Sequence, residues 1–203
     1  SETVNLLHID TNACACGIVV KDLFPEDERA LEVASVVCDY DLWKNLDPRA
    51  AILGRVLSRE ENREHVRDCL VNGIFTDEVI EEQYKEIDAE MRAMIARSIR
   101  NARIYENKYR IAFTPSYGYA SETAYAVRAR YGSEIEVIVS RSGRFSIRSV
   151  PPISHLIARQ FHGGGHPHAA GGSFHFSILD QLSFLLFRRT RHFTRLVEVA
   201  DSI

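Results

Sequence analysis

The residues with the clearest chemical potential in this 203-residue chain form a short run, 163–172, with the sequence Gly-Gly-Gly-His-Pro-His-Ala-Ala-Gly-Gly. Glycine tolerates positive φ angles and leaves its backbone N–H groups uncovered, so consecutive glycines can form a concave nest for an anion. A histidine beside them can donate a hydrogen bond to phosphate and adds positive charge when protonated. We therefore predict that Gly163, Gly164, Gly165 and His166 bind phosphate or nucleic acid. A flexible turn between a helix and a strand is the alternative interpretation.

The histidines of this segment also suggest a metal site. His162, His166 and His168 are close in sequence, but their spacing matches no recognised zinc arrangement, and no nearby Asp, Glu or Cys completes a ligand set. Anion binding is therefore favoured over metal binding.

Three arginines precede the glycine run and supply further anion ligands. Arg141, Arg144 and Arg148 lie in a predicted hairpin, and the planar guanidinium suits bidentate recognition of phosphate. We predict that Arg148 and Arg141 bind the same phosphate-bearing ligand as the glycine run. For any one of these arginines, a solvated hairpin face is the alternative.

The distribution of charge agrees with an anionic ligand for the second half. The chain has a net charge of −3, but residues 1–102 contain 12 Lys/Arg against 21 Asp/Glu, and residues 103–203 contain 13 against 7. Six of the eight histidines also lie in the second half. This asymmetry predicts a boundary near residue 105 and an anion-binding second half. Neutralisation of the two halves across an interface is the alternative.

The elements that must position these residues form an α/β lobe. Strands are predicted where apolar residues alternate with polar ones between residues typical of turns. Helices are predicted where apolar residues recur at three- and four-residue spacing and where a residue typical of a helix end follows, such as Gly132 after the helix at 120–130. The predicted strands are 109–114, 134–139, 144–150 and 173–176, and the predicted helices are 120–130, 151–161 and one or two within 179–203.

The first half is predicted to be mostly helical. A short strand at 4–9 precedes helices near 13–24, from Pro25 onward, and at 48–58 and 60–72. A longer helix at 76–104, capped by Thr76, carries an apolar stripe. About 28 helical residues span about 42 Å, so we predict a helix that connects two lobes, with a coiled coil as the alternative.

Composition excludes several classes of protein. With 45% hydrophobic and 26% charged residues, the chain is predicted to be soluble and globular. No apolar run reaches membrane-spanning length, and the first residues do not have the pattern of a signal peptide, so we expect neither feature. The four cysteines lack paired C-x-x-C spacing, so neither a zinc site nor a disulfide framework is predicted. We expect a cytoplasmic protein that does not insert into membranes.

Four segments of the second half together resemble a known domain. Residues 146–149 (Ser-Ile-Arg-Ser), 157–161 (Ile-Ala-Arg-Gln-Phe), 163–166 (Gly-Gly-Gly-His) and 169–171 (Ala-Ala-Gly) look like the C-terminal substrate-binding domain of the DHH phosphoesterase superfamily. That group includes RecJ-like exonucleases, oligoribonucleases, cyclic-dinucleotide phosphodiesterases and exopolyphosphatase-related proteins. The resemblance implies that Arg148, His166 and the glycines bind the terminal nucleotide or phosphate. A related domain occurs in alanyl-tRNA synthetases, so the motif alone does not imply hydrolysis.

The resemblance also implies a catalytic lobe with two divalent metals, manganese or magnesium. Its ligands are an Asp-x-Asp motif, a further Asp, an Asp-His-His triplet and a last Asp, of which this sequence lacks the Asp-x-Asp and the triplet. Asp39 is the best match to the last Asp, followed by Asp41. A helix cap or an ion pair is the alternative for both. His8 and Asp10 are less favoured as replacement ligands.

The resemblance therefore implies an α/β protein of two lobes joined by a long helix. Residues 1–75 would be the incomplete, mostly helical end of the catalytic lobe, 76–104 the connecting helix, and 105–203 the substrate-binding domain, a small mixed sheet with flanking helices. We expect the substrate-binding part of a metal-dependent phosphodiesterase or exonuclease that acts on nucleotides or short nucleic acids, inactive or weakly active alone. A non-catalytic nucleotide- or nucleic-acid-binding module is the alternative.

Expected partners follow from this assignment. The ligand would be a nucleotide or the terminus of a single-stranded nucleic acid. A truncated sheet exposes an edge that recruits another chain, so we expect either a homodimer or a segment that precedes the first residue. A fragment, an inactive homologue and a subunit all remain open.

Overall fold

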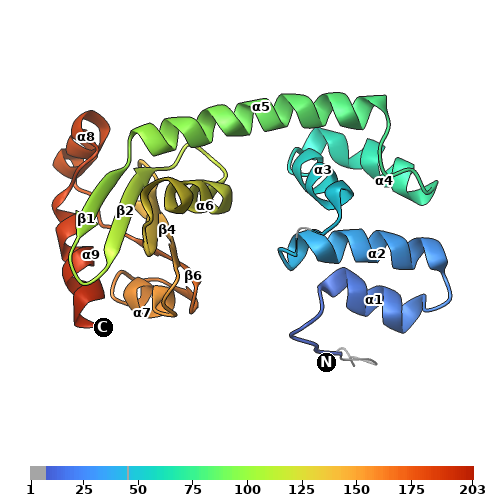
Figure 1. Ribbon diagram of the computed structural model, residues 1–203, viewed down its shortest axis with the longest axis horizontal. Coiled ribbons are helices and arrows are strands. Elements are labelled where there is room, and N and C mark those ends of the chain that lie inside the picture. Colours follow the sequence, from blue (N-terminus) through green and yellow to red (C-terminus); the bar gives the residue numbers. More distant parts are fainter. Residues whose placement is uncertain (1–7, 45) are drawn as a thin grey trace. The chain divides into compact units, whose positions relative to one another are not determined.

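The computed structural model describes residues 8–44 and 46–203 and divides into two compact units, Ser1–Ala89 and Glu90–Ile203 (Figure 1). The division falls within α5 (Glu78–Arg100), so this helix contributes residues to both units. The α/β architecture with a mixed sheet in the second part of the chain confirms the predicted fold class. None of the described helices combines the length and the apolar composition of a membrane-crossing segment.

The first unit consists of helices packed around a small apolar core. Its helices are α1 (Ala15–Leu23), α2 (Glu28–Asp41), α3 (Pro48–Val56), the 3-10 turn η1 (Glu60–Asn62), α4 (Arg63–Val71) and the first part of α5. The core consists of Val36, Ala50, Leu53, Val56, Val66, Cys69, Phe75 and Ile80. Of the strand predicted at 4–9, residues 4–7 lie outside the described residues, and His8 and Ile9 are not in a strand.

Aspartates, each one residue before a helix, begin three of these helices. The side chains of Asp27, Asp47 and Asp77 accept hydrogen bonds from backbone N–H groups in the first turns of α2, α3 and α5. A carboxylate in this position satisfies a donor that has no partner within the helix. The prediction that Thr76 caps the long helix was therefore wrong by one residue, because Asp77 makes this bond.

A disulfide joins Cys14, before α1, to Cys38 in α2, with a Cα–Cα distance of 5.3 Å. The prediction of no disulfide was wrong, because helix packing rather than local spacing brings the two residues together. Gly17 permits this approach, since a Cβ at that position would lie 2.8 Å from the Cys38 sulfur.

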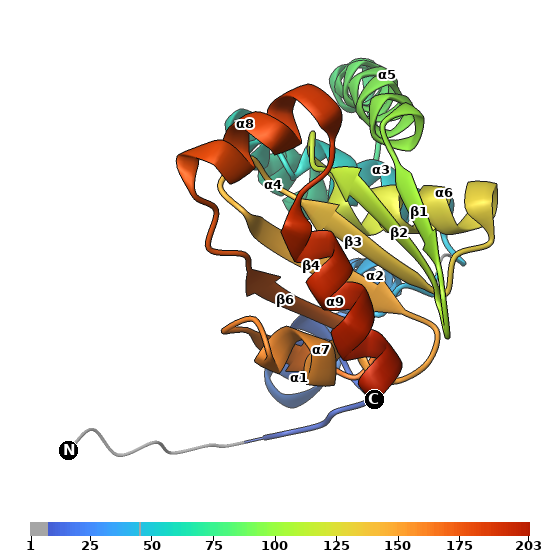
Figure 2. The same cartoon turned by 90° about the vertical axis from the view of Figure 1, so that its left-hand side faces the viewer.

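The second unit is built on a six-stranded sheet with the order β1-β2-β3-β4-β6-β5 (Figure 2). Only β2 and β3 are parallel, joined through α6; the other neighbours are antiparallel. The strands are β1 (Arg103–Glu106), β2 (Arg110–Pro115), β3 (Ile135–Val139), β4 (Arg144–Ser149), β5 (Gly164–His166) and β6 (Ala169–Ser173). The helices are α6 (Ala120–Tyr131), α7 (Ser154–Arg159), α8 (Ile178–Phe187) and α9 (Arg191–Ser202).

The two faces of this sheet have different coverings. One face packs against α7 and α9 through a core that includes Phe113, Val137, Ile147, Ile157 and Leu196. Figure 2 shows α9 crossing this face, with α6 on the other side. The end of α5 also packs on the α6 side, because Thr114 Oγ1 donates to the carbonyl of Ser98 (2.6 Å).

The segment predicted as a glycine loop is instead the hairpin of β5 and β6. His166 and Ala169 are its last pair, with Pro167 and His168 in the turn. Gly163 and Gly165 lie against the β6 backbone: a Cβ would be 1.9 Å from the Gly171 oxygen in the first case and 2.6 Å from the Ala170 Cα in the second. These glycines therefore permit close packing of the two strand backbones. The sequence-based prediction of an anion-binding nest did not anticipate this role.

Two other element predictions differ from the structure. The helix predicted to reach residue 104 ends at Arg100, because Arg103 begins β1, a strand the sequence did not reveal. The strand predicted at 173–176 is wrong beyond Ser173, since β6 runs from Ala169 to Ser173.

The glycine run supplies a test of this packing. We expect Gly163→Ala to lower the free energy of unfolding by about 1–3 kcal/mol, because the added methyl group overpacks the β5–β6 contact. Gly164→Ala is the matched control, since nothing lies within 4 Å of its added Cβ. Chemical denaturation measures both variants. Equal effects of the two substitutions would contradict the described hairpin.

The start of α8 generates a pH-dependent prediction. The Ser177 hydroxyl donates to Asp180 Oδ2 (2.7 Å), with Arg191 and His192 nearby, and these contacts lower the pKa of Asp180 to about 2. A lowered carboxyl pKa adds stability above the unfolded-state pKa of about 4 that is lost as the pH falls toward 2. We expect the urea midpoint to fall more steeply over this range in the native chain than in Asp180→Asn. Parallel curves for the two proteins would contradict this assignment.

Candidate substrate-binding site

The parallel strands β2 and β3 end beside a groove. Ser116 directly follows β2, and its backbone N–H donates to the carbonyl of Val139 at the end of β3 (2.7 Å). Ser140 directly follows β3, and both serines line the groove. The carboxyl ends of parallel strands connected through a helix are a common location for ligands. The β2–α6–β3 connection therefore positions one end of a candidate binding site.

The groove has a volume of about 630 Å³ and a polar lining. Five serines, one arginine and one histidine contribute, and none of the residues that line it is acidic. The lining consists of Ser116, Ile138, Ser140, Ser142, Arg144, Phe145, Ser146, His162, Gly163, Gly171, Gly172 and Ser173. Hydroxyl donors with a nearby cation and without carboxylates favour an anionic, oxygen-rich ligand.

The pairing of β4, β6 and β5 places two predicted ligands, Arg148 and His166, on the face of the sheet that bears the groove, although neither residue lines the groove. Ser146 pairs with Gly171, which pairs with Gly164, and Arg148 pairs with Ala169, which pairs with His166. Directly paired residues lie on the same face of a sheet. Arg148 and His166 therefore share the face of the groove, about 10 Å apart at two strand spacings, with only the small Ala169 between them.

Arg148 is half-buried and contacts neutral acceptors. Its guanidinium donates to the carbonyl of Ile147 (3.0 Å) and to Ser121 Oγ in the first turn of α6 (3.1 Å). Burial lowers the pKa of Arg148, and the nearby charge of Glu122 opposes that change. A guanidinium remains ionised in proteins, so this positive charge is partly desolvated and oriented, as a ligand-binding arginine should be.

The neighbour of Arg148 in β3 is Glu136, a fully buried carboxylate on the same face. Arg128 Nε donates to Glu136 Oε1 (3.1 Å), as does the Ser133 hydroxyl (2.7 Å). Burial raises the pKa of Glu136, while Arg128 and Ser133 act in the opposite direction. The hydrogen bonds of this carboxylate thus go to Arg128 and Ser133.

The histidines near the hairpin have different environments. His166 is exposed on β5, whereas His162 lines the groove with a positive φ of 55°. His168 Nδ1 lies 3.0 Å from the carbonyl of Ser149, to which only a protonated nitrogen can donate. His168 is thus part of the packing of the turn, whereas His162 lines the groove and His166 lies on the same face of the sheet.

Arg141 lies in a neighbouring cavity rather than in the groove. This cavity has a volume of about 120 Å³ and contains Arg141, Arg188 and Gln181, and it shares Ser116 with the groove. The structure therefore does not place Arg141 beside Arg148, and it adds Arg188, which the sequence analysis did not identify. The groove serines Ser116 and Ser140 were also missed; their only signal was their position directly after strands.

Asp39, the predicted metal ligand, is buried at the end of α2. Its carboxylate accepts hydrogen bonds from the backbone N–H groups of Leu46 (3.0 Å) and Asp47 (3.2 Å). Of the less favoured candidates, His8 Nδ1 contacts Asp22 (2.6 Å), and Asp10 accepts from the backbone of Asn12 (2.9 Å). All three side chains thus contact residues of the first unit.

The described residues do not fit the two-metal centre that the family resemblance implies. Across 8–44 and 46–203, the single group of three His, Cys, Asp or Glu side chains that converges closely enough for a metal is His65, Cys69 and Asp77. Asp39 does not belong to such a group, so its role as a metal ligand remains a prediction.

Comparisons with known proteins identify the fold. No family model and no curated protein sequence matches the chain. It is similar to a solved structure of a pGpG-specific phosphodiesterase from Vibrio cholerae, with a TM-score of 0.54 and 10% identity over 91% of this chain and 72% of that one.

Two other solved structures show weaker similarity. An uncharacterised protein from Helicobacter pylori G27 has a TM-score of 0.34 and 17% identity over 96% of this chain and 67% of that one. An exopolyphosphatase-related protein from Bacteroides fragilis has a TM-score of 0.45 and 15% identity over 84% of this chain and 49% of its own. At 10% identity, the similarity to the pGpG-specific phosphodiesterase shows a shared fold.

Proposed function

We propose that the second unit binds the phosphorylated end of a nucleotide or short single-stranded nucleic acid, as the substrate-binding part of a metal-dependent phosphodiesterase. The observation that carries this proposal is the shared row of Arg148, Ala169 and His166 on the groove face of the sheet. A cation and a histidine separated by a small residue leave room for a phosphate group between their side chains.

The groove supplies complementary chemistry for the rest of the ligand. Its volume is within the range of about 300–1,000 Å³ that is usual for small-ligand sites. Serine hydroxyls can donate to phosphate oxygens or exchange hydrogen bonds with a sugar. An anion beside Arg148 would restore some of the charge stabilisation that burial removes from the guanidinium. The site thus favours a charged ligand that is rich in oxygen atoms.

Hydrolysis requires more than these binding groups. In the DHH superfamily two metals activate water and neutralise charge on the phosphate. Because the described residues do not assemble the corresponding ligands, we infer that this chain binds substrate better than it hydrolyses it. The same observation favours a second candidate function, a non-catalytic nucleotide- or nucleic-acid-binding module.

Binding tests the common element of both functions. With a fluorescent 5′-phosphorylated dinucleotide, we expect Arg148→Ala and His166→Ala each to raise the Kd by about 10- to 150-fold, because a charge-assisted contact contributes about 1.5–3 kcal/mol. Arg110→Ala is the charge-matched control, since Arg110 is exposed at the opposite end of β2 and pairs with Glu106. Affinity should also fall as salt increases. Unchanged affinity in both site variants would contradict the proposal.

Turnover distinguishes the two functions. We expect the chain to bind the dinucleotide in the presence of manganese without releasing mononucleotide, as measured by chromatography. Release that Asp39→Asn abolishes, with binding retained, would instead show that Asp39 belongs to a working metal centre. Asp27→Asn is the matched control, because Asp27 also accepts a backbone hydrogen bond at a helix end.

A further inference from the structure

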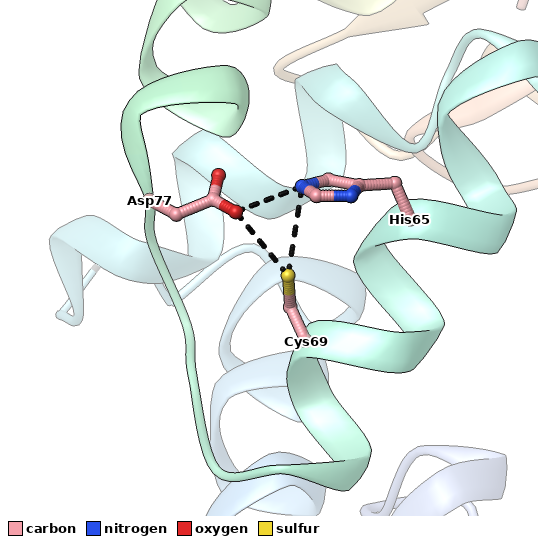
Figure 3. A group of neighbouring side chains, drawn as sticks. All are labelled: His65, Cys69 and Asp77. Carbon is pink, nitrogen blue, oxygen red and sulfur yellow. Dashed lines mark hydrogen bonds and ion pairs between the residues drawn. The ribbon is translucent and has the colours of Figure 1, made fainter.

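Three side chains that can bind metal converge in the first unit, at the junction of α4 and α5 (Figure 3). His65 and Cys69 are four residues apart on α4, which places them on one face of the helix. Asp77 lies immediately before α5. His65 Nε2 is 2.8 Å from Asp77 Oδ2, and Cys69 Sγ is 3.4 Å from the same oxygen and 3.6 Å from Nε2.

These separations are close to those of ligands around a tetrahedral zinc ion. Zinc–sulfur, zinc–nitrogen and zinc–oxygen bonds of the usual lengths place sulfur about 3.6 Å from the other two atoms, and nitrogen about 3.4 Å from oxygen. The sulfur already has these separations, and only the imidazole and carboxylate must separate further. A point about 1.9 Å from all three atoms exists in their plane, so an ion slightly out of that plane has normal bonds to each.

The surroundings of the three residues orient them toward this point. The Ile80 N–H donates to Asp77 Oδ1 (2.8 Å), which leaves Oδ2 for the cluster. Cys69 is buried in the core of the first unit, whereas the His65 side chain is 43% exposed. The protein thus fixes the sulfur and the carboxylate, and solvent has access for a fourth ligand.

The geometry does not fit a cysteine nucleophile activated by a histidine–aspartate pair. In such a relay the imidazole contacts the nucleophile through one nitrogen and the carboxylate through the other. Here Nε2 faces both partners. Burial also raises the pKa of the Cys69 thiol, and Asp77 adds to that effect, whereas an activated thiol has a lowered pKa.

We propose that His65, Cys69 and Asp77 form a binding site for Zn²⁺ or a similar thiolate-preferring divalent cation, with water as the fourth ligand. On binding, the sulfur forms the metal bond and its proton is released to the buffer. The thiolate and imidazole favour zinc over manganese, which prefers oxygen ligands. The site involves only residues of the first unit, so the proposal does not rest on the phosphate site proposed for the second.

Cobalt(II) tests the site in the full chain, because its spectrum reports both geometry and thiolate ligation. In a titration without thiol reductants, the chain should bind one equivalent of cobalt. Binding should produce a sulfur-to-cobalt charge-transfer band and the visible bands of tetrahedral cobalt, and added Zn²⁺ should displace the cobalt. Cys69→Ser should abolish the charge-transfer band. His65→Ala should raise the Kd for cobalt at least about tenfold. Because the His65 side chain is exposed, we expect this variant to fold.

Cys16→Ser is the matched control, since Cys16 is the other free cysteine. Its cobalt spectrum should equal that of the native chain. Absence of the charge-transfer band in the native chain, or its persistence in Cys69→Ser, would overturn the proposal and leave the cluster as a helix cap with an ion pair. Circular dichroism of each variant confirms that lost binding is not lost folding.

Discussion

The pairing register of β4, β6 and β5 is the constraint on which the candidate site depends. Arg148 and His166 belong to different strands and share one face only because Ala169 lies opposite both. Since side chains alternate between faces, a shift of one residue would turn His166 toward the opposite face and break the row. The chemistry of the site is therefore set by backbone pairing more than by any side-chain contact.

Several contacts hold this register. The backbone N–H groups of Ser149 and Ser154 donate to the turn carbonyls of His168 and Pro167 (3.2 and 2.8 Å). At the other end of the hairpin, Gly163 fits against the β6 backbone, where a larger residue would collide. The hairpin is thus fixed at its turn and at its base. The intervening strand residues, including His166, remain available on the groove face.

Periodic apolar patterns predicted much of the fold. Predictions from local sequence failed where contacts between residues far apart in the chain determine the structure. The hairpin near 134–150 and the helix ending at Gly132 follow from alternation and from a left-handed glycine. The β5–β6 hairpin was interpreted as a loop, because glycine has a low strand propensity and its role here is steric. Strand β1 was hidden at the end of a helical pattern.

The same distinction applies to the sites. Residue type and order predict Arg148 and His166 as ligands, but they do not show that the two residues share a face, which requires the register. The cluster of His65, Cys69 and Asp77 was missed because Asp77 lies eight residues after Cys69 in the sequence. The turn between α4 and α5 brings the two side chains together. Arg141 was selected by type, and the structure places it in a different cavity from the groove.

Glu136 adds a consequence for the charge available to a ligand. It lies next to Arg148 across β3 and β4, but its carboxylate accepts from Arg128, and the charge that acts on the Arg148 guanidinium is that of Glu122. Arg128 and Ser133 therefore satisfy this buried carboxylate, and the Arg148 guanidinium donates to neutral acceptors. The positive charge that Arg148 presents on this face of the sheet thus depends on Arg128, a residue in the last turn of α6 that does not line the groove.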